Sequence, residues 1–349
     1  MIRKRSELLA EIQSKPELRA IFTEWEEKAQ EDFLDFCCGN KAVKILYDSF
    51  FKEILNPEYD SERLEDLLSL LLGEKVRIIK VLPNDSTRIA DEASLLIMDI
   101  VVELENGSIA NVEVQKIGYL FPGERSACYS ADLLLRQYKR VRGEKQKKFS
   151  YKDIKSVYTI VFFEQSPKEF HEFSKEYLHY FEQKSNTGLE LELLQKYLFI
   201  PLDIFKKTIH NKPIKNKLDA WLLFFSGEKT EDILRLIEEY PEFRVLYEDV
   251  YNLCLNTEKV MEMFSKELRE LDRNTVQYMM DEMQDTIDEQ KEKIEEQKDK
   301  IEAQQDTISE MQEAIDEKEN SMNDMRSTID EQKNMIDELR RMLQAVKET

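Results

Sequence analysis

The first part of the chain moves from helical to strand-like spacing of its apolar residues. Helical spacing runs from Ser14 and Pro16 to Gly39, and again over residues 42–55. A third helix is expected to begin at Asp60 or Ser61 and to end at Gly73. Residues 75–84 then have the β-branched pattern that is typical of a first strand. Three helices that lead into a sheet predict an α/β or α+β domain.

A strand pair is the next predicted feature. Residues 95–116 are rich in β-branched side chains and are interrupted by Asn106-Gly107, a strong hairpin signal. A helix is expected over residues 124–143, and residues 157–164 have the composition of a short buried strand. From Glu169 to Asp272 the spacing is mainly helical, with several breaks, and we expect this part to cover the sheet.

The last part of the chain has an uninterrupted seven-residue repeat of apolar side chains from Met280 to Leu343. This repeat defines the a positions of a left-handed coiled coil. The d positions are half polar, so we expect a weak or conditional homo-oligomer, and Gln at d leaves both a dimer and a trimer open. The e and g positions are largely basic or neutral and offer little mutual pairing, so a single long solvated helix is the alternative.

Composition narrows the class of protein. A length of 349 residues favours two structural units. No apolar run approaches the roughly 20 residues of a membrane span, and the basic N-terminus lacks the apolar core of a secretory signal, so we expect a cytoplasmic protein without membrane partners. The four cysteines and three histidines lack zinc-site spacing. A net charge of -21 argues against indiscriminate nucleic-acid binding but leaves room for a local basic groove.

The candidate chemistry lies in the predicted hairpin. Period two points Glu113 and Gln115 to one face of a strand, and Asp99 lies on the partner arm. Paired carboxylates repel unless a divalent ion joins them, and such an ion activates water beside a phosphodiester. A two-residue turn would set Asp99 opposite Val114, on the wrong face, whereas a turn one residue longer, or a bulge, would set it opposite Gln115. A three-residue loop with Gly107 in the left-handed conformation meets this requirement.

These residues and their order resemble the PD-(D/E)xK nuclease superfamily, and NVEVQ resembles the ExQ variant of the recombination-promoting nuclease and putative transposase family. The resemblance extends over about residues 44–272. It implies a restriction-endonuclease-like core with a mixed sheet flanked by helices. It also implies Asp99 and Glu113 as ligands of Mg²⁺ or Mn²⁺, DNA as the partner, and Gln115 where the superfamily usually has lysine. An amide supplies no positive charge, so activity is expected to be slow or lost.

Two further sets of residues follow from the resemblance. Superfamily members often add a glutamate from an early helix, for which Glu53 is the candidate, with a solvated helix residue as the alternative. The helix after the metal strands carries basic and amide side chains that are expected to contact DNA phosphates, with a solvated charge run as the alternative. These residues are Arg136, Gln137, Lys139, Arg140 and Arg142.

The sequence therefore predicts four parts: an N-terminal helical extension (1–43), a nuclease core (44–170), a helical cover (171–277) and a coiled coil (278–349). The leading hypothesis is a metal-dependent DNA endonuclease that assists recombination or transposition. The alternatives are a DNA-binding protein with a decayed centre and a coiled-coil scaffold or regulator.

Overall fold

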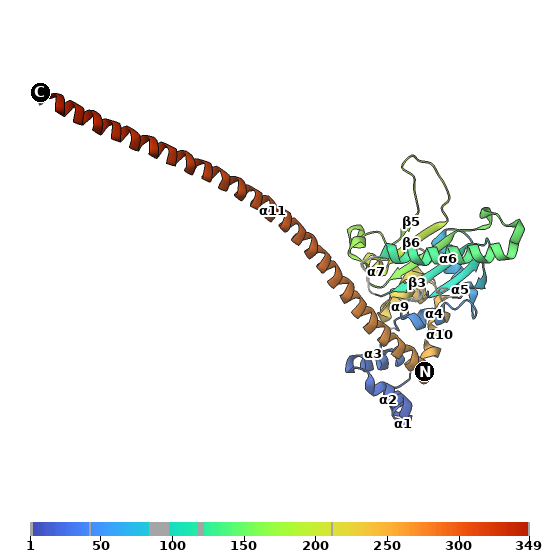
Figure 1. Ribbon diagram of the computed structural model, residues 1–349. Helices are drawn as coiled ribbons and strands as arrows, with labels where there is room; N and C mark the ends of the chain where they lie inside the picture. Colours follow the sequence, from blue (N-terminus) through green and yellow to red (C-terminus); the bar gives the residue numbers. More distant parts are fainter. Residues whose placement is uncertain (1–2, 42, 84–97, 117–121, 211, 348–349) are drawn as a thin grey trace. The chain divides into compact units, whose positions relative to one another are not determined.

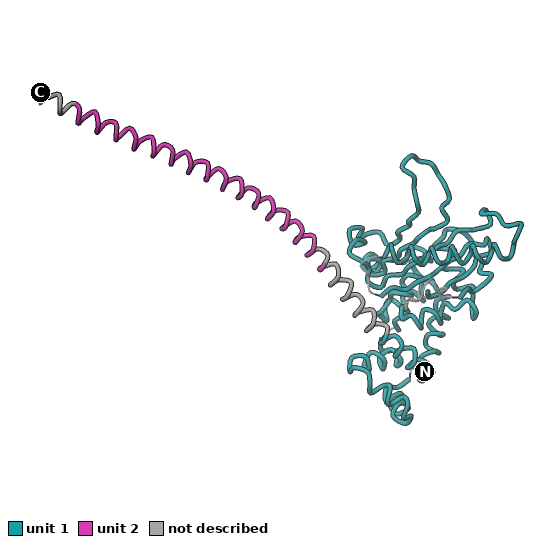
Figure 2. The backbone as a smooth tube through the Cα atoms, viewed as in Figure 1, with its two compact units in different colours: residues 1–279 teal, residues 280–349 magenta. Residues whose placement is uncertain are grey.

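The computed structural model describes residues 3–41, 43–83, 98–116, 122–210 and 212–347. The chain divides into two compact units, residues 1–279 and 280–349 (Figure 2). The start of the predicted hairpin at residues 95–97 and the side chains of Met280 and Leu343 lie outside the described part. Along the described residues, no helix combines the length and the apolar character that crossing a membrane requires.

Unit 1 is built on a mixed sheet of six strands in the order β1-β2-β3-β4-β6-β5. Figure 1 shows this sheet among the helices of unit 1. The strands are β1 (Ile78–Val81), β2 (Ile100–Leu104), β3 (Ile109–Gln115), β4 (Val157–Phe163), β5 (His179–Phe181) and β6 (Gln195–Pro201). Strands β3, β4 and β6 are parallel, whereas β1–β2, β2–β3 and β5–β6 pair antiparallel. The predicted mixed sheet with flanking helices is confirmed.

The turn between β2 and β3 has three residues, 105–107. The Leu104 N–H donates to Ser108 O at 2.9 Å, and Gly107 has φ +85. Glycine reaches this left-handed region without a Cβ clash, so the expected loop with Gly107 in that conformation is confirmed. Ile100 pairs with Val112, which places the preceding Asp99 beside Glu113. Gln115, the partner of Asp99 expected from the sequence, lies two residues beyond the observed partner, Glu113. Glu113 and Gln115 lie on the same face of β3.

Helices cover both faces of the sheet. Helix α6 (Pro122–Lys145) packs Tyr129 and Leu133 against Val101, Ile109 and Val157 on one face. The other face forms the largest apolar cluster with α5 (Ser61–Leu72) and with the four helices that follow β6. Those helices are α7 (Leu202–Ile209), α8 (Lys217–Ser226), α9 (Thr230–Glu239) and α10 (Phe243–Leu255).

A separate apolar cluster joins the N-terminal helices to the start of the last helix. Its members come from α1 (Arg5–Ser14), α2 (Pro16–Glu24), α3 (Glu27–Cys37) and α11 (Thr257–Lys347). The single helix expected from Ser14 to Gly39 is interrupted at Trp25, whose backbone is extended. The interruption lets the indole ring pack against the rings of Phe33 and Phe264, with ring centroids 5.0 Å apart in each pair. It also lets Trp25 Nε1 donate a hydrogen bond to Ser265 Oγ at 3.2 Å.

Other sequence expectations are corrected. The helix expected over residues 42–55 is only α4 (Asp48–Ile54), and α6 continues past Gly143 to Lys145. The segment after Glu169, expected to be mainly helical, contains β5 and β6, so the sheet extends beyond residue 170. Short 3-10 helices complete the fold at η1 (Gln146–Lys148), η2 (Tyr151–Asp153) and η3 (Lys168–Phe173).

The long helix α11 spans 91 residues, and its part in unit 2 is a single helix whose apolar heptad side chains are about half exposed. Ile301 is 53% exposed and Ile308 is 65% exposed. The predicted long C-terminal helix is confirmed, and its self-association is taken up below as a proposal.

Candidate metal centre

The hairpin register brings the two predicted carboxylates together. Asp99 directly precedes β2, and its backbone N–H donates to Glu113 Oε1 at 3.3 Å. The Val114 N–H donates to Asp99 Oδ2 at 2.7 Å. Each carboxylate is therefore tied to the backbone of the opposite strand, so neither is an independent surface acid.

Helix α4 adds two charged side chains that sequence reasoning missed. Lys52 Nζ lies 2.9 Å from Asp48 Oδ1 and 3.0 Å from Asp99 Oδ1, and the carboxyl groups of Asp48 and Asp99 are hydrogen-bonded to each other. Asp48 and Lys52 are four residues apart and share one face of α4. That spacing is common on ordinary solvated helices, so the sequence carries no specific signal for it.

Glu53, the sequence candidate from the same helix, is not brought to this centre. Its carboxylate pairs with Lys259 at 2.5 Å, and it lines a separate surface cavity with Asn56 and Asp249. Glu53 directly follows Lys52, so it points about 100° away around the helix axis. Of the acids on α4, Asp48 is therefore the one that contacts Asp99.

Burial controls the protonation of the centre. Burial and the nearby charge of Asp48 raise the pKa of Asp99 to about 7. Burial and the Asp99 charge also raise the pKa of Glu113 well above its usual range. For Asp48, burial opposes ionisation, but the hydrogen bond with Asp99 and the charge of Lys52 outweigh it and lower its pKa. Of these two carboxyl groups, Asp99 is therefore the one whose surroundings favour the protonated form.

The donor chemistry fits a hard divalent cation. Asp48, Asp99 and Glu113 offer carboxylate oxygens, the ligands that Mg²⁺ and Mn²⁺ prefer. Burial and the charge of a neighbouring acid raise the pKa values of Asp99 and Glu113, and a divalent cation would favour their ionised forms. Across the residues that the structure describes, no three His, Cys, Asp or Glu side chains are already arranged to hold a metal ion. Lys52 Nζ takes the position between Asp48 and Asp99, so an ion would displace it.

Gln115 stands at the end of β3, on the same face as Glu113. Its amide nitrogen is buried and has no hydrogen-bond partner among the described residues. Arg125, from the first turns of α6, lies close enough to Glu113 to lower that carboxyl's pKa, and its Nε donates to Tyr129 OH at 3.0 Å. Tyr129 is buried between α6 and the sheet, as expected of a packing residue.

The predicted DNA-contacting residues on α6 divide into two groups. Gln137 is 1% exposed, and its amide bonds to Gly107 O and to the Lys155 N–H. Its side chain therefore connects α6 to two loops of the fold. Arg136 pairs with Asp132 at 3.0 Å, and Arg140 contacts both carboxylate oxygens of Glu103 at 2.7 Å. By contrast, Lys139 and Arg142 are exposed.

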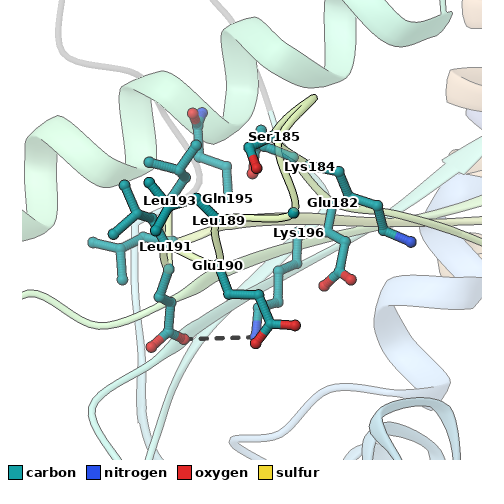
Figure 3. Close-up of a pocket in the computed structure, with 13 residues that line it drawn as sticks. Glu182, Lys184, Ser185, Leu189, Glu190, Leu191, Leu193, Gln195 and Lys196 are labelled. Atoms are coloured by element: carbon teal, nitrogen blue, oxygen red, sulfur yellow. Dashed lines mark ion pairs between the residues drawn. The ribbon is translucent and has the colours of Figure 1, made fainter.

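A cavity of about 610 Å³ lies elsewhere, along the segment that connects β5 to β6 (Figure 3). It is lined by residues 182–185 and 188–196, with Lys196 paired to Glu192 at 3.6 Å. None of the residues that form the carboxylate centre contributes to its lining. This cavity is therefore separate from the carboxylate centre.

The comparisons with known proteins agree with the order of these elements. The family model described as PD-(D/E)XK nuclease family transposase matches residues 45–283, which include α4, the hairpin and α6. Neither the curated proteins nor the solved structures gave a match. Since the matched segment covers more than half of the sequence, the chain belongs to the PD-(D/E)XK nuclease family of transposases.

Proposed function

We propose that the protein is a metal-dependent DNA endonuclease that hydrolyses phosphodiester bonds during recombination or transposition. The observation that carries this proposal is the series of contacts that links Asp48 at the start of α4, Asp99 just before β2 and Glu113 in β3. Lys52 Nζ lies between Asp48 and Asp99, and the Asp99 N–H donates to Glu113 Oε1. A nuclease-like activity is also what membership of the family suggests. The choice of Mg²⁺ or Mn²⁺ as the ion and of DNA as the substrate belongs to the proposal.

Each residue has a defined task in this scheme. Asp48, Asp99 and Glu113 would hold the ion, which supplies an activated water and offsets charge on the scissile phosphate. The backbone N–H of Val114 fixes the orientation of the Asp99 carboxylate through its 2.7 Å hydrogen bond. Gln115 contributes a buried amide donor that is suited to a phosphate oxygen.

Positive charge near the reacting phosphate comes from side chains other than residue 115. Lys52 is a permanent cation at the carboxylates, and Arg125 lies close to Glu113. An ion held by Asp48 and Asp99 would displace the Lys52 ammonium group from between them and leave this cation available to a phosphate. The glutamine in β3 is thus compatible with activity in this chain.

Helix α6 is the proposed backbone-binding element. Its 24 residues extend over about 36 Å, and about 26 Å separate Arg125, near the centre, from Arg142 along the axis, a length that matches several phosphates of one DNA strand. Lys139 and Arg142 are the side chains that remain exposed for such contacts, followed by Lys147 and Lys148. Gln137 is removed from the proposed DNA surface because it is buried.

We also propose that unit 2 joins two or more copies of the chain. Its a-position isoleucines leave an apolar seam about half exposed, and a second copy of the same heptad repeat presents a matching seam. Paired nuclease heads would allow cuts on both strands of DNA. Sedimentation velocity of the full chain and of a chain lacking residues 280–349 tests this proposal. A full chain that sediments as a monomer, as the shortened chain does, would refute it.

Plasmid nicking with Mg²⁺ tests the enzymatic proposal. Wild-type protein is compared with Asp99→Ala, Glu113→Ala and Asp48→Asn, and Glu53→Gln serves as the matched carboxylate control on the same helix. We expect the first three variants to lose at least about 100-fold in rate, since each removes an ion ligand, and Glu53→Gln to cut like the wild type.

Two outcomes would contradict this proposal. Equal nicking by wild type and all variants would trace the cutting to a contaminant. Salt-dependent gel shifts with no metal-dependent cutting would identify the alternative, a DNA-binding protein with a decayed centre.

A further inference from the structure

A buried carboxylate on α11 lies next to the centre. Glu267 is 1% exposed, and its Oε2 accepts a hydrogen bond from the Asp48 backbone N–H at 3.0 Å. Its other oxygen, Oε1, pairs with Lys116 Nζ, and the Lys116 side chain is 8% exposed. Glu267 is therefore shared between two partners that are far apart in the sequence.

The two partners belong to the elements that carry the centre. Asp48 is the first residue of α4, so Glu267 binds the N-terminal end of that helix, where a negative charge is favourable. Lys116 directly follows Gln115 at the end of β3, and its ammonium group lies 5.0 Å from the centre of the Tyr47 ring. One carboxylate thus joins the start of α4 to the end of β3.

The position of Glu267 is itself firmly fixed. Val260, Met261 and Phe264 on the preceding turns of α11 are buried among the N-terminal helices. Trp25 Nε1 donates to Ser265 Oγ at 3.2 Å, two residues before Glu267. Glu267 therefore approaches the centre from a rigid part of unit 1.

Stability alone does not explain such a pair. Removing two charges from water costs about as much as their attraction returns, and well-packed apolar residues in their place are often as stable. A buried ion pair does, however, fix distance and direction more narrowly than apolar packing does. The arrangement around Glu267 therefore favours a geometric role.

We propose that Glu267 is a positioning residue that sets the separation between Asp48 on α4 and the Glu113-Gln115 segment of β3. Through it, the helix that continues into the heptad repeat takes part in shaping the ion site. This inference rests on the proposed function, because the geometry that Glu267 sets matters only if these carboxylates bind an ion.

The test measures Mn²⁺ affinity by calorimetry on the full chain, without DNA. Glu267→Gln keeps an acceptor for the Asp48 N–H but loses the charge that faces Lys116, whereas Glu267→Ala loses both. We expect Mn²⁺ affinity to fall roughly 10- to 100-fold in Glu267→Ala and by a smaller factor in Glu267→Gln, as for other residues that orient ligands. Glu262→Gln, an exposed acid on the same helix, is the matched control and should bind Mn²⁺ like the wild type.

A second readout separates positioning from general weakening. Hydrogen exchange of the Asp48–Phe51 amides should rise in Glu267→Ala, and DNA affinity without metal should stay unchanged. If Glu267→Ala fails to fold, Glu267→Gln and Lys116→Met carry the test, and each should lower Mn²⁺ affinity by a smaller factor than that expected for Glu267→Ala.

The outcomes are distinguishable. Mn²⁺ binding that is lost in Asp99→Ala but unchanged in every Glu267 and Lys116 variant overturns this inference and leaves the proposed function standing. A wild-type protein that binds no Mn²⁺ overturns both.

Discussion

Replacing Asp99 by Asn should stabilise the metal-free protein at alkaline pH. Burial and the charge of Asp48 raise the pKa of Asp99 from 3.8 to about 7, so the folded protein binds a proton there more tightly than the unfolded chain does. Between these two values the folded state holds the extra proton, and stability therefore falls as the pH rises through this window. Above pH 7 the Asp99 carboxylate is ionised, and burying this charge lowers the free energy of unfolding by its full amount.

The magnitude follows from the size of the shift. About three pH units correspond to about 4 kcal/mol in the free energy of unfolding. The pKa of about 7 already includes the attraction of Lys52, and Asn keeps an oxygen for the Val114 N–H. We therefore expect Asp99→Asn to be more stable than wild type by up to about 4 kcal/mol at pH 8 and by less than half of that at pH 5.

Urea denaturation followed by tryptophan fluorescence measures this difference, because Trp25 and Trp221 are both buried in unit 1. Asp306→Asn removes an exposed charge from α11 and controls for the acidic net charge. Adding MgCl₂ should stabilise wild type and leave Asp99→Asn unchanged. A variant that is less stable than wild type at pH 8, or an equal difference at both pH values, would refute the reasoning.

Three other predictions use different parts of the molecule. Gln137→Ala should lower the free energy of unfolding by about 1–3 kcal/mol in thermal denaturation and leave the salt dependence of DNA binding unchanged. Lys139→Ala should reduce the slope of log affinity against log salt concentration by about one in a filter-binding titration. Gly107→Ala should lower the free energy of unfolding by about 1–2 kcal/mol in urea denaturation, because φ is +85 and an added Cβ would lie 3.2 Å from Lys155 Cγ. An unchanged urea midpoint would contradict the claim that a side chain strains this turn. Ile308→Glu should lower the sedimenting mass to that of a monomer, while unit 1 unfolds as in wild type. A sedimenting mass that the substitution leaves unchanged would contradict self-association through the apolar heptad positions.

The elements with strong local signals were predictable. Helix α5 begins after Asp60, whose side chain accepts from the Glu62 N–H, and ends at Gly73 with φ +70, as its capping residues indicate. Asp99 and Glu113 were located from strand period and resemblance, and the turn length needed to join them was deduced beforehand. Local chemistry and short-range geometry were sufficient in these cases.

The missed features depend on contacts between distant segments. Strand β6 is a short apolar run whose parallel pairing with β4 leaves no turn signal, and β5 has only three residues. The break at Trp25 follows from the burial of its indole ring against α11. Asp48 and Lys52 look like an ordinary surface pair until the hairpin packs against α4, so the sequence alone could not select Asp48 over Glu53.

The three-residue turn has a consequence for how this protein tolerates insertions and deletions. Surface loops usually accept a change of length with little loss of stability. Here, however, the number of residues in the turn 105–107 sets the register of the whole of β2 against β3. Loss of a single residue would rotate Asp99 to the opposite side of the hairpin without altering any acidic side chain. Homologues that keep both acids but change this count by one residue are therefore expected to lack the pairing of the two carboxylates, so the loop length is a marker of this centre alongside the acids themselves.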